Sequence, residues 1–549
     1  MKNSILFLTA TVALSCLSAQ AMTITFVGDS ITQGGTFNSG TVSSFRYQLF
    51  KNFVDNGVSY DPMGMTVGAS KGVSTASLTP DYRGFSFSNV SEAAASGRAY
   101  QYSGHAASSS YKADPGTVAN DANRGPVTVK LGLENPYTET TDTYYNGSTL
   151  TTYKGDTYQS LYGDVLMDRV CIMIGINDLY DGNDLAATAG FVGEIVSAYQ
   201  AYNPDVRIHL FELLPTGSDN GTGTNNKNNY APYNAVLKEA ASSWSTATST
   251  VTVDNISTGF YAENGAMIDT AAGAHPNRQG ELIVAGNIAR VLGVGQRTAG
   301  LERKGAAALS SQLAWTGAAS SPTLSMIVDG DSKTFTTLNI FSIAANGNLS
   351  ISSELAGGRD ARLVWNSTGV AREFTLSFSV KMAETGNEQN AFGLMFGNGE
   401  GAGALYVTEC GILWGPSNST TLLYGSNNIA DTTHNTFSST EDFIDITISY
   451  LGSGHEGVAS GFYIWLGDQL IGEALGAVSS ISAHKDKILF GDIGASWLTQ
   501  AELASLSFEA GTAYAPLARS IPEPSAVGLL AGLGAVVLAG MRRRRKMRR

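Results

Sequence analysis

MTITFVGDSIT, residues 22–32, is the stretch that decides the fold. Its first six residues are apolar or β-branched, which is typical of a buried strand, and Gly28 ends the run. The strand then leads Asp29 and Ser30 into a turn. On local sequence, Ser30 or Thr32 could simply cap the following helix, because a hydroxyl oxygen accepts hydrogen bonds from the first amides of a helix. A chemical role for Ser30 therefore depends on the rest of the chain.

Strands and helices alternate after this opening stretch. The expected strands are 22–27, 170–174, 206–213 and 251–254, and the expected helices lie within 45–54, 191–199, 233–244 and 279–292. Alternation of this kind builds a parallel sheet with helices on both faces. We therefore predict an α/β domain over residues 22–295.

The hydrophobic period changes to two after residue 305. Apolar residues alternate with polar ones in 374–382, 444–450 and 462–466, and Gly, Ser and Asn turns separate the runs. Short alternating strands predict an antiparallel sandwich, which we place at 307–515. The texture of its last strands resembles a concanavalin-like (laminin-G-like) jelly roll. Residues 294–306 are the expected linker.

Both ends of the chain carry export signals. Residues 1–21 have a basic start, an apolar centre and Ala19-Gln20-Ala21, the pattern of a signal peptide cleaved before Met22. Lipidation of Cys16 is the alternative. At 521–549, Pro522-Glu-Pro524 precedes an uncharged run and a basic end, which resembles the PEP-CTERM tail read by exosortases in Gram-negative bacteria. The resemblance implies export, sorting by an exosortase and a transmembrane helix; a plain C-terminal membrane anchor is the alternative.

The charge balance excludes one class of partner. Setting aside Lys2 and the seven basic residues after Met541 leaves 26 basic residues against 47 acidic ones, a net charge of −21. Such a surface repels nucleic acid. Cys171 and Cys410 are the only cysteines after residue 21, so no disulfide framework is expected. We find no metal-ligand spacing and expect no cofactor.

Three polar motifs follow or precede apolar elements of the α/β region. Gly28–Thr32 follows the first strand, Gly175-Ile-Asn-Asp178 follows 170–174, and His275-Pro-Asn277 precedes the last helix. Each has a structural explanation alone: a helix cap, an Asx turn and a structural histidine. The carboxyl ends of parallel strands meet at one edge of the sheet, however, so we expect the three motifs to converge there.

In this order, the three motifs resemble the SGNH (GDSL-type) hydrolase family. The resemblance covers residues 22–295 and implies a flavodoxin-like parallel sheet and ester hydrolysis. It implies that Ser30 is the nucleophile and His275 the base that removes its proton, because a serine hydroxyl is a weak nucleophile at neutral pH.

The same resemblance supplies the remaining roles. The backbone amide of Ser30, the side chain of Asn177 and one more backbone amide would form the oxyanion hole. The further amide belongs to Gly104 or Ala107 in Ser103-Gly-His-Ala-Ala107, with 68–72 as the alternative location. Asp29 and Asp178 would support the two turns.

One position departs from the family pattern. The family's carboxylate three residues before the histidine is replaced by Ala272. Asp269 is the candidate that would orient His275 instead; a backbone carbonyl could do so too, or the enzyme could be slow or inactive.

These patterns predict an exported serine esterase that removes acyl groups, chiefly acetyl, from carbohydrate. A Ser-, Thr-, Tyr- and Gly-rich insertion at 107–162 would shape its substrate site, with tyrosines that could stack on sugars: Tyr137, Tyr144, Tyr145, Tyr153 and Tyr158. His105 could line the same cleft. The alternatives are a lipid or small-ester hydrolase and a catalytically impaired surface protein that binds glycan.

Overall fold

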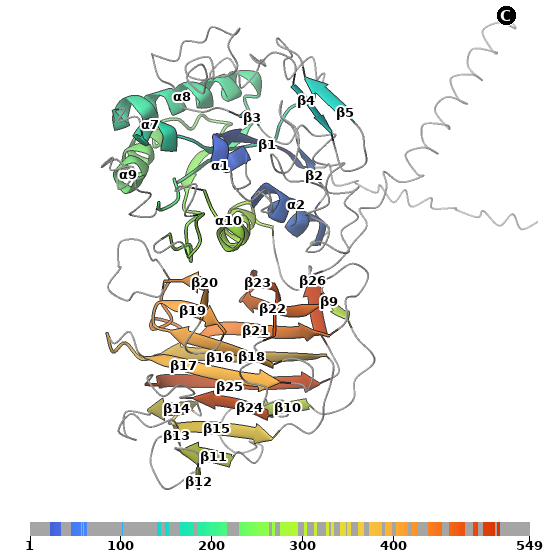
Figure 1. Ribbon diagram of the computed structural model, residues 1–549. Helices are drawn as coiled ribbons and strands as arrows, with labels where there is room; N and C mark the ends of the chain where they lie inside the picture. Colours follow the sequence, from blue (N-terminus) through green and yellow to red (C-terminus); the bar gives the residue numbers. More distant parts are fainter. Residues whose placement is uncertain are drawn as a thin grey trace, which may run out of the picture.

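The computed structural model contains an α/β domain at one end and an antiparallel β domain at the other (Figure 1). The structure describes residues 22–33, 45–55, 58, 60–62, 101–102, 140–143, 149–152, 165–180, 184–216, 230–262, 266–269, 275–294, 301–304, 312–315, 325–328, 331–333, 341–346, 348–352, 361–366, 373–386, 390–397, 402–415, 420–426, 437–452, 460–477, 487–491, 498–510 and 513–516.

The α/β domain is built around a parallel sheet. Its strands are β1 (Met22–Gly28), β2 (Tyr60–Pro62), β3 (Gln101–Tyr102), β6 (Arg169–Met173), β7 (Arg207–Phe211) and β8 (Val251–Asp254). Its helices are α1 (Ser30–Gln33), α2 (Phe45–Asp55), α7 (Ile176–Tyr180), α8 (Leu185–Tyr202), α9 (Tyr230–Ala241) and α10 (Arg278–Val291). A hairpin of β4 (Thr140–Thr143) and β5 (Thr149–Thr152) lies within the sequence insertion.

The strand order places a topological switch point beside β1. The sheet runs β2-β1-β6-β7-β8, with β3 also paired to β1, and every pairing is parallel. The chain therefore builds outward from β1 in both directions. In doubly wound sheets of this order, ligands bind at the carboxyl ends of the two strands where the direction reverses. Here these strands are β1 and β6.

Helices cover both faces of the sheet (Figure 1). On one face, the rings of Phe45 and Phe50 from α2 lie 6.0 and 6.1 Å from that of Phe26 on β1. Helices α2 and α10 pack side by side on this face, and α8 and α9 pack together on the other. The predicted strands and helices of this domain are confirmed to within a few residues.

The second domain contains two antiparallel sheets. Its strands are β9 (Leu301–Lys304), β10 (Gln312–Trp315), β11 (Ser325–Val328), β12 (Asp331–Lys333), β13 (Phe341–Ile343), β14 (Leu349–Ser352), β15 (Ala361–Asn366), β16 (Phe374–Met382), β17 (Ala391–Gly397), β18 (Ala402–Thr408), β19 (Gly411–Trp414), β20 (Thr421–Gly425), β21 (Ile444–Leu451), β22 (Gly461–Leu466), β23 (Gln469–Leu475), β24 (Lys487–Gly491), β25 (Gln500–Ala510) and β26 (Ala513–Pro516).

The two sheets enclose an aromatic core. One sheet runs β13-β14-β25-β16-β21-β22-β23 and the other β12-β11-β15-β24-β17-β18-β19-β20. The ring of Phe462 lies 4.9 Å from Trp414 and 5.6 Å from Phe396, across the two sheets. The predicted antiparallel β region is therefore present.

One local prediction and one alternative interpretation were wrong. The predicted linker 294–306 contains strand β9, which pairs with β26, the last strand of the domain in sequence. A pairing over that sequence separation has no local signal. The motif at 175–178, which could have been a simple Asx turn, instead begins helix α7.

Several predictions lie outside the described residues. They concern the signal peptide, the sorting tail with its transmembrane helix, Gly104, Ala107, His105, Ala272, residues 68–72 and the five tyrosines of the insertion. Within the described part of the chain, no helix is both long and apolar enough to cross a membrane.

Candidate active site

The turn after β1 is compact because Gly28 lacks a side chain. Gly28 lies opposite Met173 in the β1–β6 register. A Cβ atom at Gly28 would lie 2.1 Å from Oγ1 of Thr32 and 2.3 Å from the carbonyl oxygen of Met173. Only glycine lets the chain fold back this closely on the strand end. Thr32 lies inside α1, so the interpretation of Thr32 as a helix cap was wrong.

Asp29 occupies the position before α1 and is fully buried. Its Oδ1 atom accepts a hydrogen bond of 3.0 Å from the amide of Ile31, so the carboxylate holds the start of the helix. Burial raises the pKa of Asp29 to about 7; the negative charge of Asp178 adds to the rise, and backbone hydrogen bonds oppose it. Ser30 is the first residue of α1, and the structure describes its backbone.

Helix α9 packs against the turn after β6. Gly175 has a φ of +122°, and a Cβ atom there would lie 2.8 Å from the hydroxyl oxygen of Tyr233. That hydroxyl donates to the carbonyl of Ile174 at 3.1 Å. The structure describes the backbone of Asn177, in the first turn of α7. Asp178 is fully buried beside it, where the positive end of a helix dipole favours an acidic side chain.

The next residue of α9 holds the end of β7 in the same way. The side chain of Asn234 accepts from the amide of Leu213 at 2.9 Å and donates to its carbonyl at 3.1 Å. Helix α9 therefore fixes the chain leaving two neighbouring strands. This role explains why Tyr233 and Asn234 occur side by side.

The His275 segment is paired with the chain just before it. Residue Ile268 forms a bridge with Pro276, and the amide of Asp269 donates to the carbonyl of His275 at 2.8 Å. Asn277 caps α10, because its Oδ1 accepts from the amide of Gly280 at 3.1 Å. His275 is buried, with 8% of its surface exposed. The pairing places the backbone of Asp269, the candidate orienting acid, next to His275.

Two buried ionisable side chains connect the His275 segment to the turn after β1. Arg46 on α2 is fully buried, and its Nε donates to the carbonyl of Thr32 at 2.7 Å. Glu281 on α10 is also buried, and its Oε2 accepts from the amide of Phe45 at 2.6 Å. Burial raises the pKa of Glu281, while the Phe45 amide and the charge of Arg46 oppose the rise. Helix α2 thus links the Ser30 turn to the helix that follows His275.

Strand β3 leads a further segment to the same edge. Val27 and Gly28 pair in parallel with Gln101 and Tyr102. Strand β3 therefore ends at the same edge of the sheet as β1. This position is compatible with 103–107 as the source of the additional backbone amide.

A second described histidine has a different environment. Nδ1 of His209 lies 3.0 Å from Oδ2 of Asp254, and its Nε2 lies 3.2 Å from Nη1 of Arg169. Because arginine can only donate, Nε2 must accept and Nδ1 must carry the proton. His209 lies within strand β7 rather than at a strand end. Its carboxylate partner therefore has a structural role in the body of the sheet.

The described contacts connect the turn after β1 with the helix that follows His275. Neighbouring strands deliver Ser30 and Asn177, and α2 joins their edge to the helix after His275. The sequence interpretation missed Arg46 and Glu281, although a signal existed. Arg46 shares a helical stripe with Phe50 and Phe53, and a charge within an apolar stripe requires a buried partner. Among the described residues, no group of three or more His, Cys, Asp or Glu could hold a metal ion.

The strand order defines a doubly wound α/β protein, a class in which ligands bind at the switch point. Residues 119–283 match the model of the GDSL-like Lipase/Acylhydrolase family, and residues 520–546 match the PEP-CTERM protein-sorting motif. The predicted resemblance is confirmed by this match, which supports a hydrolase of the GDSL-like type that acts on ester bonds. The matched residues include Asn177 and His275 and begin after Ser30.

Several solved structures are similar to parts of this chain. An acetyl esterase mutant with an acetate ion is 17% identical, with 49% of this chain and 96% of that chain covered and a TM-score of 0.30. A carbohydrate esterase family 3 protein from Talaromyces cellulolyticus is 17% identical, with 49% and 96% covered and a TM-score of 0.28. Arcelin-5, a lectin-like defense protein from Phaseolus vulgaris, is 10% identical, with 37% and 99% covered and a TM-score of 0.21. A comparison with curated protein sequences found no match.

Proposed function

We propose that the protein is an exported serine esterase that removes acyl groups, chiefly acetyl, from carbohydrate. The single observation that carries this proposal is the link through Arg46 and Glu281. It joins the turn that contains Ser30 to the helix that follows His275, although the two segments are far apart in sequence. A nucleophile and its base must be held together in this way.

The first half of the reaction forms an acyl-enzyme. His275 removes the proton of the Ser30 hydroxyl as the oxygen attacks the ester carbonyl. The bond between the carbonyl carbon and the sugar oxygen then breaks, and the protonated imidazole gives its proton to that oxygen, which leaves as a sugar hydroxyl. The acyl group remains on Ser30.

Donors at the strand ends stabilise the negative charge that develops on the carbonyl oxygen. These donors are the amide of Ser30, the side chain of Asn177 and a backbone amide of Gly104 or Ala107. Each such donor can contribute about 3–4 kcal/mol. The pairing of β3 with β1 supports the third donor, because it brings the chain before Ser103 to this edge.

Water completes the reaction in the second half. His275 removes a proton from the water molecule, whose oxygen attacks the acyl carbon. The bond to the Ser30 oxygen then breaks, the imidazole returns the proton to that oxygen, and the free acid is released. Asp269 orients the imidazole in this mechanism. Its support is the backbone hydrogen bond to His275, which places the residue beside the histidine. Asp29 and Asp178 hold the two turns.

The location implied by the sorting motif and the second domain favour a glycan substrate. The sorting motif implies export and membrane-associated sorting in a Gram-negative bacterium, so the proposed substrates are polysaccharide esters outside the cell. We propose that the signal peptide directs export, that residues 525–540 form the membrane helix and that an exosortase recognises the tail. The antiparallel domain, with two facing sheets, is proposed to be a glycan-binding jelly roll of the concanavalin or laminin-G type.

A second candidate is a catalytically impaired surface protein that binds glycan. The observation that favours it is Ala272 at the position of the family's carboxylate. Loss of the orienting acid can lower turnover by about four orders of magnitude in serine proteases. Lipid or small-ester hydrolysis is a third outcome that the following assay separates.

Hydrolysis assays with the purified protein test the proposal. Release of acetate from acetylated xylan, and of 4-nitrophenol from 4-nitrophenyl acetate and its longer-chain esters, is measured for the natural protein and for Ser30→Ala. The proposal expects acetate release from xylan that Ser30→Ala abolishes. Preference for long acyl chains would indicate a lipid esterase, and equal rates in both proteins, or none in either, would favour the impaired surface protein.

A further inference from the structure

The middle of helix α10 is buried on all sides. Its buried residues run without a break from Gly280 to Ala285 and continue from Asn287 to Ala289. The outer helices of a domain normally bury one stripe and leave the other in water. The outer side of α10 is covered instead by the β-sandwich, whose strand β23 packs along the helix (Figure 1).

Gln279 crosses the domain boundary in the first turn of α10. Its Nε2 atom donates to the carbonyl of Leu423 on β20 and to that of Ile471 on β23, each at 2.7 Å. Both N–H groups of the amide are therefore used. One side chain, four residues after His275, joins the start of the helix to two separate sandwich strands.

Gln469 on β23 makes the return contacts farther along the helix. Its Nε2 donates to the carbonyl of Ile283 at 3.2 Å, and its Oε1 accepts from Nη2 of Arg290 at 3.0 Å. A Cβ atom at Gly286 would lie 2.6 Å from that Nε2 atom. Together with Gln279, these helix positions follow steps of four, three and four residues, so one continuous stripe of α10 faces the sandwich.

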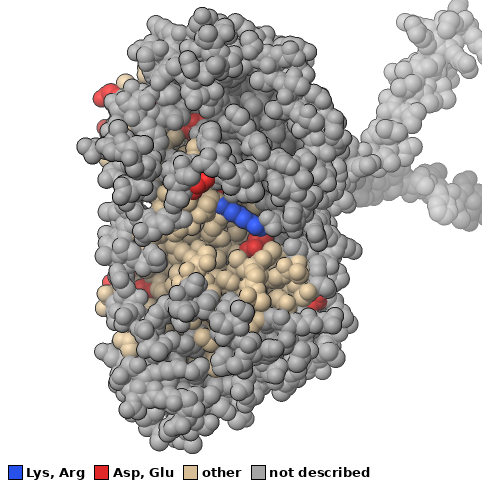
Figure 2. Space-filling view, in the orientation of Figure 1, with Lys and Arg blue, Asp and Glu red and all other residues tan. Residues whose placement is uncertain are grey.

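The ion pair at the rim adds little. Nη2 of Arg278 lies 3.9 Å from Oε2 of Glu473, and the arginine is 42% exposed. In the space-filling view, basic and acidic side chains lie next to each other where the two domains meet (Figure 2). At 3.9 Å the two atoms are too far apart for a hydrogen bond, so the buried amides carry the polar part of the interface.

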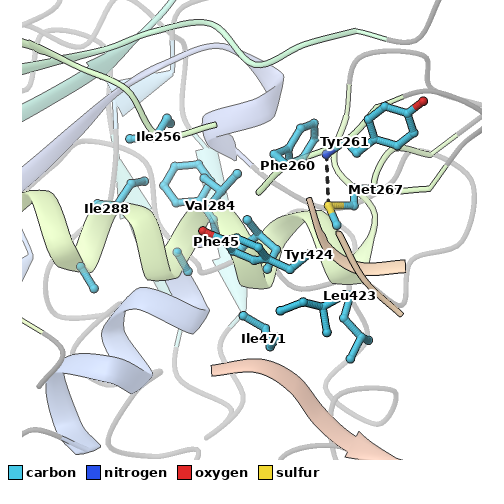
Figure 3. Close-up of a cluster of buried hydrophobic side chains, with 14 of the residues drawn as sticks. Phe45, Ile256, Phe260, Tyr261, Met267, Val284, Ile288, Leu423, Tyr424 and Ile471 are labelled. Carbon is cyan, nitrogen blue, oxygen red and sulfur yellow. Dashed lines mark hydrogen bonds between the residues drawn. The ribbon is translucent and has the colours of Figure 1, made fainter. Parts of the chain in front are cut away.

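The sandwich also packs against the chain that precedes His275. Gly259 has a φ of +76°, and a Cβ atom there would lie 2.2 Å from the ring of Tyr424. The amide of Gly425 donates to the carbonyl of Gly259 at 2.9 Å. Figure 3 shows the apolar cluster that continues this contact, with residues from both domains. Its labelled members are Phe45, Ile256, Phe260, Tyr261, Met267, Val284, Ile288, Leu423, Tyr424 and Ile471.

The two segments that frame His275 therefore both lie against the sandwich. Met267, in the cluster, accepts a hydrogen bond at its carbonyl from the amide of Asn277 at 3.0 Å. Gln279 holds the helix that starts immediately after Asn277. The position of the imidazole depends on these two segments, because His275 is part of the pairing between them.

We propose that the β-sandwich holds part of the esterase site in position, and that Gln279 is the residue through which it positions His275. The inference rests on the proposed role of His275 as the base. Gln279 itself touches no reacting atom and is a positioning residue. The second domain then contributes to the hydrolase reaction by positioning His275, whatever ligand it binds.

Gln279→Glu in the full chain tests the proposal. The substitution keeps the shape of the side chain and places a carboxylate oxygen against two carbonyl oxygens. Gln200→Glu on α8 is the matched control, because Nε2 of Gln200 likewise donates to a carbonyl, that of Trp244 at 2.9 Å, and to Oγ of Ser249 at 3.2 Å. Thermal midpoints, kcat, KM and the pH profile of kcat/KM are measured with 4-nitrophenyl acetate for both variants and the natural protein.

The proposal expects a loss of kcat in Gln279→Glu alone. A misplaced catalytic group costs roughly 10- to 100-fold in rate, whereas KM for the small ester should change little. The acidic limb of its pH profile should also move, because the surroundings of the imidazole change. Gln200→Glu should lower the thermal midpoint without either effect. Natural kcat and an unmoved limb in Gln279→Glu would overturn the proposal.

A second pair of variants covers the case in which Gln279→Glu does not fold. Gly286→Ala displaces the Gln469 side chain from α10, whereas Gly190→Ala on α8 meets nothing within 4 Å. Alanine favours both helices, so both proteins should fold. A lower kcat in Gly286→Ala alone supports the proposal, and equal kcat values contradict it. Full activity of Ser30→Ala would instead refute the esterase mechanism itself, whatever Gln279 does.

Discussion

Glu409 in the sandwich and Asp29 in the α/β domain are both buried carboxylates, but their surroundings differ. Oε1 of Glu409 accepts from the amide and hydroxyl of Thr385 and from Nδ2 of Asn390, and Oε2 accepts from the amide of Gly386. Asp29 lies instead near a second buried carboxylate, Asp178, and its pKa rises to about 7. Four donors surround the buried carboxyl group of the sandwich, whereas the edge of the parallel sheet brings two buried carboxyl groups close together.

Glu281 belongs with Asp29 in this comparison. Its pKa is also raised by burial, despite the amide of Phe45 and the charge of Arg46. Buried carboxylates with raised pKa values are unfavourable for folding, and they gather at functional sites more often than elsewhere. We infer that the edge around Ser30 is arranged for chemistry, whereas the interior of the sandwich is arranged for stability.

The largest expected effect distinguishes the two described histidines. His275→Ala should lower kcat by roughly a million-fold, as removal of the catalytic histidine does in a serine protease. His209→Ala should leave kcat within a few-fold, because His209 lies within β7 and pairs with Asp254. The rates are measured with 4-nitrophenyl acetate at a temperature where both variants are folded. Equal losses of kcat in the two variants would contradict a catalytic role for His275 and a structural role for His209.

The next effect concerns the link between the two catalytic segments. Arg46→Met should lower kcat and destabilise the protein by about 1–3 kcal/mol, because it removes the buried donor to the carbonyl of Thr32 and the positive charge near Glu281. The double variant Arg46→Met with Glu281→Met should recover part of that stability but none of the lost kcat. Urea denaturation gives the stabilities. A double variant with natural kcat would show that the link does not position the site.

A third effect is a change in the pH dependence of stability. Asp29 has an unfolded pKa near 3.8 and a folded pKa of about 7, so the folded state holds a proton that the unfolded state has lost between these values. Its contribution to stability is fully present below about pH 4 and disappears by about pH 7, with a slope of at most about 1.4 kcal/mol per pH unit.

Asp29→Asn tests this directly. The free energy of unfolding is measured from pH 4 to pH 8 in both proteins, and the slope should be shallower in the variant. Some slope should remain, because the raised pKa of Glu281 acts in the same direction. Parallel curves for the two proteins would mean that Asp29 does not titrate in this range.

The smallest effect is expected in the sandwich. Glu409→Gln turns an amide N–H toward groups that donate, which should cost about 1–3 kcal/mol of stability. Esterase kcat should stay unchanged, since Glu409 contacts neither α10 nor the chain before His275 in the described contacts. Thermal unfolding and the ester assay measure the two quantities. A loss of kcat as large as that in Gln279→Glu would contradict the expectation that the interface positions the esterase site and the sandwich interior does not.

The sequence predicted the parts of the fold that depend on local periodicity. The alternation in 22–295 and the two-residue period in 374–382 each reflect the side-chain geometry of a single element. Strand β9 was missed because its residues gain their partner only from β26, more than two hundred positions away. The packing of α10 on the sandwich was missed for the same reason.

The candidate site was predicted unevenly. The residues at strand ends could be found, because a polar motif directly after an apolar run is visible in the sequence. The supporting residues could not be placed, since Arg46, Glu281 and Gln279 act on segments that the fold brings to them. Their residue types indicate buried charge or amide groups, but only the three-dimensional contacts identify their partners.

Labelling of the intact protein with a fluorophosphonate tests the central claim most directly. An activated serine attacks the phosphorus and expels fluoride, which leaves a stable covalent adduct that mass spectrometry locates. We predict one adduct, on the peptide that contains Ser30, and its loss in His275→Ala. No adduct, an adduct on another residue, or undiminished labelling of Ser30 in His275→Ala would contradict the account.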